Sequence, residues 1–290
     1  MSEGLQVDRV TSSIGARVRG IDLASGVTDA QAEELKLALL EHLVVFLPNA
    51  TNDEDEHMQL SRIFGEPIPH PVNKAITGEA SLTARVRSDS YREGGNSSFH
   101  TDYSFCVETP DVSVLRAITM SSRGGDTIWA NMYQAYETLS DDMKAYIERL
   151  DGYHAQSERF TELMIQWYGE EAGRKGAKQF AGATHPVVIK HPETNKKALF
   201  VNPGYTKSIV GLPPNESRSL LDFLFQHIHN PRFHCRYRWA VGDIAIWDER
   251  ATVHMGEGMY GSEERELLRI TMGSRRPEAA RESERMLASA

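Results

Sequence analysis

The sequence has little cysteine, no long hydrophobic run and a deficit of positive charge. Its 290 residues include two cysteines, Cys106 and Cys235, and these have no Cys-x-x-Cys or other metal-binding spacing. We expect two reduced thiols, not a disulfide framework or a cysteine-based metal site. Residues 1–8 lack the basic segment and apolar run of a secretory signal, and no stretch approaches the length of a membrane span. A cytoplasmic protein that contacts no membrane is therefore predicted.

The charge balance restricts the possible partners. There are 32 Lys and Arg against 41 Asp and Glu, which gives a formal net charge of −9. A nucleic acid is not expected as a partner, because its backbone needs a basic surface. An anionic substrate would be repelled by the protein as a whole, so a local group of Arg or Lys must attract it.

The residue pattern predicts many short strands and a few helices. Helices are expected after the N-cap Thr28 and at 53–64, 140–150 and 215–229. The predicted strands are 6–10, 16–23, 44–47, 112–119, 127–130, 197–202, 235–239, 243–247 and 266–273. This order favours a mainly β, α+β fold, namely a double-stranded β-helix (jelly roll) with flanking helices.

The domain organisation is expected to be simple. No linker or repeat interrupts residues 1–277, which are predicted to form a single domain, and the charged, Ala-rich residues 278–290 form a tail. The polar segment 155–182 lies between the candidate metal-binding segments described next. It is expected to be either a lid over the site or a surface insert, and both alternatives stay open.

A His-x-Asp pair, His100 and Asp102, is the first sign of chemistry, and His254 lies far downstream. Residues i and i+2 of a strand point to one face, so the pair could hold one ion. Two histidines and one carboxylate are the ligand set of a non-haem Fe(II) centre with three open positions for O2 and a co-substrate. The same donors also bind Zn²⁺, so a zinc-binding hydrolase or a non-catalytic jelly-roll protein remains an alternative. Other histidines are expected to be ordinary surface residues: His42, His57, His154, His227 and His229.

Two arginines, Arg265 and Arg269, follow His254 by 11 and 15 residues. Their four-residue spacing keeps both on one face of a strand, and that face would otherwise be apolar. Buried guanidinium groups are costly unless they meet carboxylates or similar anions. The pair is predicted either to bind anionic ligands or to form ion pairs with internal acidic residues.

Five motifs occur in an order that is typical of one family. They are Phe99-His100-Thr101-Asp102, Gly124-Gly125-Asp126-Thr127-Ile128-Trp129-Ala130-Asn131, His185-Pro186-Val187-Val188, Ala198-Leu199-Phe200-Val201-Asn202, and Asp243-Ile244-Ala245-Ile246-Trp247-Asp248 running on to His254. From about Leu5 to Pro277 the chain resembles the taurine / 2,4-dichlorophenoxyacetate dioxygenase family, whose members are Fe(II)- and 2-oxoglutarate-dependent oxygenases.

The resemblance implies a cofactor site. His100, Asp102 and His254 would bind Fe(II). Thr127 and Arg265 would hold the distal carboxylate of 2-oxoglutarate, and O2 would be the second co-substrate. The resemblance thus implies an oxidoreductase, an Fe(II)- and 2-oxoglutarate-dependent dioxygenase, that acts on a small anionic organic substrate.

The resemblance also implies a substrate site, made of His70, Asn73, Asn96, Tyr205 and Arg269, with Arg269 near the anionic group of the substrate. The implied reaction is hydroxylation of an alkylsulfonate such as taurine, with succinate and CO2 as co-products. An aryloxyalkanoate, an alkyl sulfate ester or another small carboxylate is the alternative substrate. A homo-oligomer, either a dimer or a tetramer, is expected.

The chain departs from the family pattern at three positions. Asn73 stands where taurine dioxygenase has a substrate-contacting tyrosine, and Phe99 replaces a tryptophan. Both changes lie in or beside the substrate pocket and therefore bear on whether taurine is the substrate. Glu249 replaces the asparagine of the common Trp-Asp-Asn-Arg sequence and is expected to touch no ligand position.

Overall fold

An eight-stranded sheet forms the centre of the structure, a computed structural model that describes residues 4–71, 74, 78, 80–87, 98–156, 158–180, 182–257 and 263–281. Its strands are β1 (Gln6–Arg9), β2 (Ala16–Arg19), β3 (Val44–Leu47), β4 (Pro67–Ile68), β5 (Thr83–Arg87), β6 (Val112–Thr119), β14 (Ile244–Asp248) and β16 (Glu266–Met272). They follow the order β1-β2-β3-β14-β6-β16-β4, and β5 also pairs with β16. Among these pairs only β2 and β3 run parallel.

Three smaller sheets complete the described strands. One has the order β13-β7-β15, formed by β13 (His234–Tyr237), β7 (Thr127–Asn131) and β15 (Thr252–Gly256). Another has the order β12-β8-β9, formed by β12 (Thr206–Ile209), β8 (Asp151–His154) and β9 (Ala183–Pro186). The last pairs β10 (Val188–Lys190) with β11 (Lys197–Leu199).

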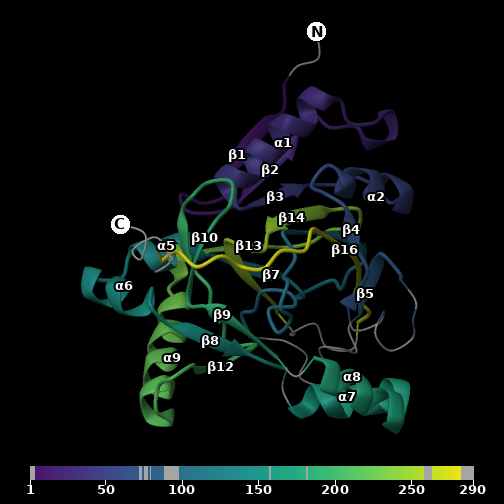
Figure 1. Cartoon of the computed structure of the whole chain (residues 1–290). Helices are drawn as coiled ribbons and strands as arrows, with labels where there is room; N and C mark the ends of the chain where they lie inside the picture. Colours follow the sequence, from purple (N-terminus) through teal and green to yellow (C-terminus); the bar gives the residue numbers. More distant parts are fainter. Residues whose placement is uncertain are drawn as a thin grey trace, which may run out of the picture.

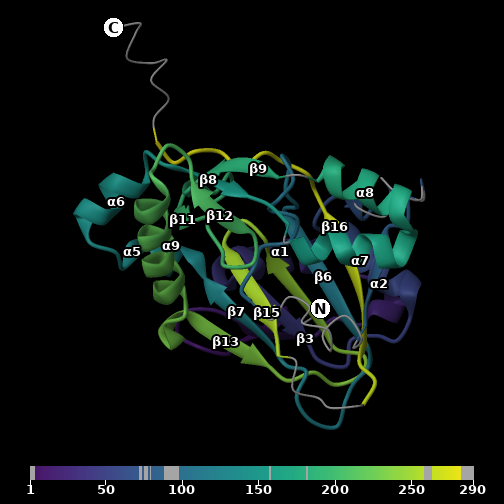
Figure 2. The same ribbon diagram turned by 90° about the horizontal axis from the view of Figure 1, so that it is seen from below.

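Helices surround these sheets. They are α1 (Asp29–His42), α2 (Glu54–Arg62), α5 (Met132–Glu137), α6 (Asp141–Ile147), α7 (Glu158–Tyr168), α8 (Glu170–Gln179) and α9 (Pro214–Ile228), with short 3-10 turns at Leu23–Ser25 and Pro231–Phe233. Thr28 caps α1 with the expected capping box, in which its side chain and that of Gln31 accept each other's backbone N–H. In Figure 1, α1 lies at one end of the molecule beside β1 and β2. Figure 2 shows α7 and α8 at the side opposite α6 and α9.

The central sheet separates two apolar cores because successive strand residues point to opposite faces. In β3, Phe46 contacts Trp129 of β7 on one face, with ring centroids 5.4 Å apart. On the other face, Val45 packs in a core with Leu35 of α1 and Leu60 of α2. Burying each large apolar side chain contributes about 1.5–3 kcal/mol. The strands that carry the candidate site are thus held from both sides.

The observed mixture of helices and sheets confirms the fold class in its coarse form. The structure adds elements that were not predicted: α5, β4, β5, β8, β9, β10, β12 and β15. Strand β15 escaped prediction because its segment Thr252–Gly256 carries the polar His254 in place of an apolar alternation. The predicted strand 197–202 ends at Leu199 in β11. Within the described residues, no helix combines the length and apolar character needed to cross a bilayer.

The prediction that five histidines lie at the surface is wrong for three of them. His57 and His154 are fully buried, and His42 is nearly so. His57 lies on the core-facing side of α2 and His154 on an inward-facing position of β8, where neighbouring elements cover them. Cys106 and Cys235 are free thiols, as predicted.

Candidate active site

His100 and His254 lie side by side because their backbones pair directly. The N–H of His100 donates to the carbonyl of His254 at 2.9 Å, and the N–H of His254 donates to that of His100 at 2.8 Å. This isolated antiparallel bridge joins the segment after Phe99 to strand β15. Paired residues of antiparallel strands project to the same face, and the two imidazole centroids are 4.3 Å apart.

Asp102 completes a cluster of three ligating groups. One donor atom each from His100, Asp102 and His254 lies within 4.8 Å of the others, and all three residues are buried. His100 Nδ1 lies 3.0 Å from the carbonyl of Ser98, which makes Nδ1–H the donor there and leaves the lone pair of Nε2 free. This Nε2 is 3.7 Å from Asp102 Oδ1. The arrangement fits a divalent metal bound by two imidazoles and a carboxylate.

The electrostatics of the cluster also suit a metal. Burial lowers the pKa of His100, and burial together with the neighbouring His100 lowers the pKa of His254 to about 3. Burial alone would raise the pKa of Asp102, but the adjacent Arg269 and the two histidines hold it below its usual range. Neutral imidazoles and an ionised carboxylate are the forms that bind metal ions.

Arg269 of β16 is engaged with the cluster. Its Nη1 donates to Asp102 Oδ2 at 2.6 Å, and its Nη2 donates to the hydroxyl of Tyr103 at 2.8 Å. The guanidinium also lies over the Tyr103 ring, 5.3 Å from its centroid. Among the described residues, Arg269 Nε is buried and has no acceptor. The ion pair with an internal acid, one of the two alternatives for this arginine, is therefore present, and donor capacity remains.

Thr127 and Arg265 line the same cavity as His100, His254 and Arg269. Thr127 begins β7 and is 3% exposed, and Arg265, just before β16, is 2% exposed. Arg265 Nε donates to the carbonyl of Gly125 at 3.0 Å. Gly125 has a φ of +73°, and an added Cβ there would lie 2.9 Å from Arg265 Cδ and Nε. A glycine at 125 therefore allows the Arg265 side chain to pass close to the backbone.

Only part of the predicted substrate site lies within the described residues. The ring of His70 is 5.2 Å from that of Tyr103, and the ring of Tyr205 is 5.9 Å from that of His100. Burial, followed by the charge of Arg269, lowers the pKa of His70 to about 4. Asn73 and Asn96 lie outside the described residues.

The segment 155–182 contains the helices α7 and α8, whose apolar side chains pack against residues that follow Asp102. Met164 is fully buried against Tyr103 and Phe105, and Tyr168, Phe180, Cys106 and Tyr205 pack against this cluster. The rings of Phe105 and Tyr205 are 5.1 Å apart. The two helices thus touch residues that neighbour both Arg269 and His100.

Comparison with known proteins decides the family. The model of the family described as "Taurine catabolism dioxygenase TauD, TfdA family" matches residues 6–271. The chain belongs to this family. It is an α-ketoglutarate-dependent dioxygenase, α-ketoglutarate being another name for 2-oxoglutarate.

Two similar proteins and one similar solved structure show which named proteins this chain resembles. A protein named alkylsulfatase from Acinetobacter baylyi is 33% identical over 276 residues, which cover 93% of this chain and 86% of that protein. An α-ketoglutarate-dependent sulfate ester dioxygenase from Pseudomonas putida is 31% identical, over 94% of this chain and 91% of that protein. The solved structure of a taurine dioxygenase from Burkholderia xenovorans superposes with a TM-score of 0.79 at 30% identity, over 95% of this chain and 93% of that one.

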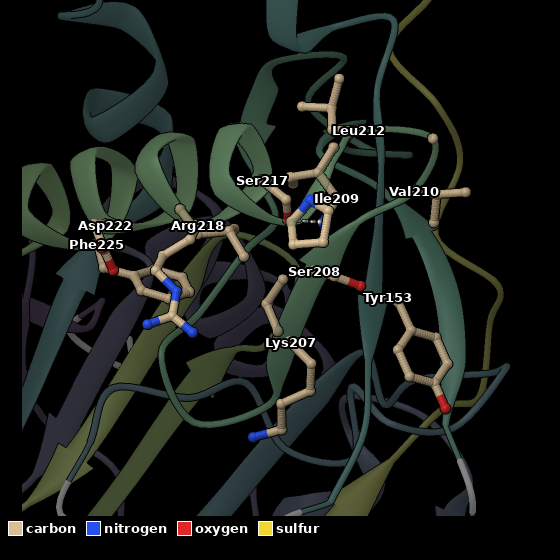
Figure 3. A pocket seen from close by; sticks show the side chains of 14 residues that line it. Tyr153, Lys207, Ser208, Ile209, Val210, Leu212, Ser217, Arg218, Asp222 and Phe225 are labelled. Atoms are coloured by element: carbon tan, nitrogen blue, oxygen red, sulfur yellow. Dashed lines mark hydrogen bonds between the residues drawn. The ribbon is translucent and has the colours of Figure 1, made fainter.

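The dioxygenase has a second, more open cavity away from the cluster. Its volume is about 650 Å³, and it lies between α9 and strands β8 and β12. Figure 3 shows Lys207 and Arg218 among its lining side chains. None of the predicted site residues lines this cavity, whereas five of them line the cavity beside His100: His100, Thr127, His254, Arg265 and Arg269.

Two residues of the dioxygenase site were missed from the sequence. Glu249 was expected to touch no ligand position, and this expectation is wrong, because Glu249 contacts the backbone of Asp102. Its Oε2 accepts the N–H of Asp102 at 3.0 Å, and its Oε1 accepts the hydroxyl proton of Ser113 at 2.7 Å. Tyr103, which orients Arg269, has a φ of +53°, a strained value for a bulky residue. The replacement of the usual asparagine by Glu249 could have indicated the role of Glu249. No sequence pattern indicated the role of Tyr103.

Proposed function

We propose that this dioxygenase uses Fe(II), bound by His100, Asp102 and His254, and 2-oxoglutarate, whose distal carboxylate is held by Thr127 and Arg265. We propose that it hydroxylates a small organic anion with a sulfonate or sulfate ester head. The single observation that carries the proposal is the buried cluster of two imidazoles and a carboxylate beside Thr127 and Arg265 in one cavity. A site that only hydrolyses an ester needs no such anchor for a second carboxylate.

Arg269 and Asp102 together would determine which carboxylate oxygen holds the metal. When bound, iron and 2-oxoglutarate activate O2 and oxidise a C–H bond of the substrate, with succinate and CO2 as co-products. Arg269 donates to Asp102 Oδ2, which leaves Oδ1, 3.7 Å from His100 Nε2, as the oxygen that would hold the metal.

Arg269 and His70 are proposed to receive the anionic group of the substrate. Arg269 keeps a buried Nε–H without an acceptor among the described residues, and guanidinium groups bind sulfonate, sulfate and carboxylate oxygens in the same forked geometry. Tyr205 would line the same pocket from the side of His100. Asn73 and Asn96 remain predicted substrate contacts on the strength of the sequence.

The body of the substrate is proposed to be a hydrocarbon chain. The cluster of Tyr103, Phe105 and Met164 with Tyr205 and Phe180 offers apolar and aromatic surface next to Arg269 and His100. Such a surface favours an alkyl group and excludes water from the reacting carbon. The names alkylsulfatase and sulfate ester dioxygenase among the relatives support alkyl sulfate esters beside alkylsulfonates such as taurine. Hydroxylation of the carbon next to either group gives an adduct that breaks down with release of the sulfur oxyanion.

A substrate panel tests the proposal. Succinate release from 2-oxoglutarate is measured with Fe(II) and O2 in the presence of taurine, hexanesulfonate, hexyl sulfate, hexanoate and 2,4-dichlorophenoxyacetate. We expect hexyl sulfate and hexanesulfonate to stimulate succinate release most, and His254→Ala to abolish it. If no sulfonate or sulfate ester stimulates turnover, the substrate class is wrong, and stimulation by the carboxylates alone would identify the alternative.

An anaerobic experiment separates this reaction from zinc-dependent hydrolysis. Without O2, the dioxygenase should release no sulfate from hexyl sulfate, and Fe(II) with 2-oxoglutarate should give the weak visible absorption band of the chelate. Sulfate release in the absence of O2 and 2-oxoglutarate would instead establish a hydrolase.

We further propose that the eight-stranded sheet and the β13-β7-β15 sheet are the two faces of a double-stranded β-helix, within one domain spanning residues 1–277. The apolar core that both sheets share, which includes Phe46 and Trp129, supports this arrangement. Assembly into a dimer or tetramer and a cytoplasmic location remain predictions from the sequence. Light scattering on the purified protein tests the assembly.

A further inference from the structure

Thr127 has a second buried neighbour besides the cavity. The indole Nε1 of Trp239, just after β13, donates a hydrogen bond to Thr127 Oγ at 3.0 Å. Both residues are buried, Trp239 being 6% exposed. Thr127 on β7 pairs in register with Tyr237 on β13, and Trp239 follows Tyr237 by two residues, so the chain passes close to Thr127 at this end of the two strands.

The indole of Trp239 is held in a fixed orientation by other rings. Its ring lies 6.3 Å from that of Trp129 and 5.4 Å from that of Tyr237, edge-to-face with the latter. Tyr237 is itself stacked on Phe46 at 4.1 Å and donates its hydroxyl proton to Asp243 at 2.9 Å. The Nε1–H of Trp239 therefore points at one place, the oxygen of Thr127.

This contact determines the polarity of the Thr127 hydroxyl. An indole N–H can only donate, so Thr127 Oγ must be the acceptor, and its own proton must point elsewhere. No acceptor for that proton is found among the described residues, and Thr127 lines the cavity with Arg265. A hydroxyl that accepts one hydrogen bond becomes a stronger donor in the next, because hydrogen bonds in series polarise one another. The bond from Trp239 should therefore strengthen the bond that the Thr127 hydroxyl donates into the cavity.

We propose that Trp239 is a positioning residue for 2-oxoglutarate: it keeps the Thr127 hydroxyl turned as a donor toward the distal carboxylate of the co-substrate. The inference rests on the proposed function, because it assumes that this carboxylate lies at Thr127. Trp239 itself touches no reacting atom and acts through Thr127.

Trp239→Phe tests the proposal, since it keeps an aromatic ring and removes the N–H. A hydroxyl released among three staggered orientations loses about threefold in affinity for its acceptor, and lost polarisation brings the loss to about threefold to fivefold. The probe is N-oxalylglycine, a non-reactive analogue of 2-oxoglutarate, titrated calorimetrically into Mn(II)-loaded protein. The KM for 2-oxoglutarate should rise by the same factor, while the KM for hexyl sulfate stays unchanged.

Trp129→Phe is the matched control. Trp129 belongs to the same aromatic cluster, and its buried Nε1 has no hydrogen-bond partner among the described residues. Losing that N–H should leave the Kd of N-oxalylglycine unchanged. A structural effect of removing an indole from this core would instead appear in both variants.

A double-mutant cycle provides the decisive comparison. In a Thr127→Val background there is no hydroxyl to orient, so Trp239→Phe should weaken N-oxalylglycine binding no further. The inference is overturned if Trp239→Phe binds like the wild type, or if its effect persists in the Thr127→Val background. If wild-type protein binds no N-oxalylglycine at all, the proposed function fails, a result that differs from failure of the Trp239 contact alone.

Nuclear magnetic resonance of the wild-type protein replaces the variant if Trp239→Phe does not fold. The chain has four tryptophans, so the indole N–H signals can be assigned by replacing the other three in turn. Addition of N-oxalylglycine to Zn²⁺-loaded protein should shift the Trp239 signal and leave that of Trp129 in place. An unmoved Trp239 signal on saturation would refute the contact.

Discussion

The replacement of Gly125 by alanine should weaken 2-oxoglutarate binding without weakening metal binding. The added Cβ would lie 2.9 Å from Arg265 Cδ and Nε, and these atoms cannot simply swing aside because Nε donates to the carbonyl of Gly125 itself. The arginine side chain must shift as a whole. Its guanidinium would then miss the position proposed for the distal carboxylate.

The size of the effect follows from two terms. A hydrogen bond to a charged group contributes about 1.5–3 kcal/mol, so displacement of the guanidinium should weaken binding by roughly 10-fold to 150-fold. The backbone term is separate: at φ +73° an alanine costs about 1–2 kcal/mol of folding stability. The first term appears in ligand affinity and the second in the free energy of unfolding.

Gly26→Ala separates the two terms experimentally. Gly26 also has a positive φ, +84°, and nothing within 4 Å of an added Cβ, so an alanine there carries a backbone cost without a clash. Calorimetry with N-oxalylglycine and urea unfolding are measured on both variants. We expect both variants to lose folding stability, and only Gly125→Ala to lose affinity for N-oxalylglycine. Equal N-oxalylglycine affinity in the two variants would refute the assignment of Arg265 to the carboxylate.

Two further predictions concern buried polar groups. Burial lowers the pKa of His57 to about 3 from an ordinary 6.5. Below pH 6.5 the unfolded chain therefore binds a proton at His57 that the folded chain does not bind, so the free energy of unfolding decreases as the pH falls. At pH 5.5 this costs about 1.3 kcal/mol relative to pH 7. His57→Leu should remove that part of the pH dependence in urea titrations, while replacement of the exposed His229 should not. Glu249→Ala leaves the N–H of Asp102 without its acceptor and should weaken Mn(II) binding by about tenfold, whereas Ser113→Ala, which removes only the other bond of Glu249, should not. Unchanged metal affinity in Glu249→Ala would contradict that role.

Local chemistry made part of this site predictable from the sequence. The His-x-Asp pair and the four-residue spacing of Arg265 and Arg269 are local signals, and the structure brings all four residues into or beside one cavity. His100 and Asp102 do not share the face of a strand as expected, because Asp102 lies in a turn that follows the bridge at His100. Helix α1 was predictable for the same reason, because the capping box at Thr28 is a local signal.

Contacts between distant segments could not be predicted in this way. The bond from Trp239 to Thr127 spans 112 positions, and the bond from Asp102 to Glu249 spans 147. The helices α7 and α8 could not be predicted for a similar reason. Their apolar residues, among them Met164, which packs against Phe105, are separated by many polar residues in the sequence. An apolar helix face of this kind is recognisable only once the surface that it packs against is known.

The reciprocal backbone bridge between His100 and His254 has a consequence for biosynthesis. The two imidazoles belong to residues 154 positions apart, and strand pairing alone brings them together. A nascent chain therefore offers no complete set of metal donors until the ribosome has passed residue 254 and β15 has docked. A metal bound by these three residues would therefore be loaded late, after synthesis of most of the polypeptide, and prematurely terminated products would lack the proposed site.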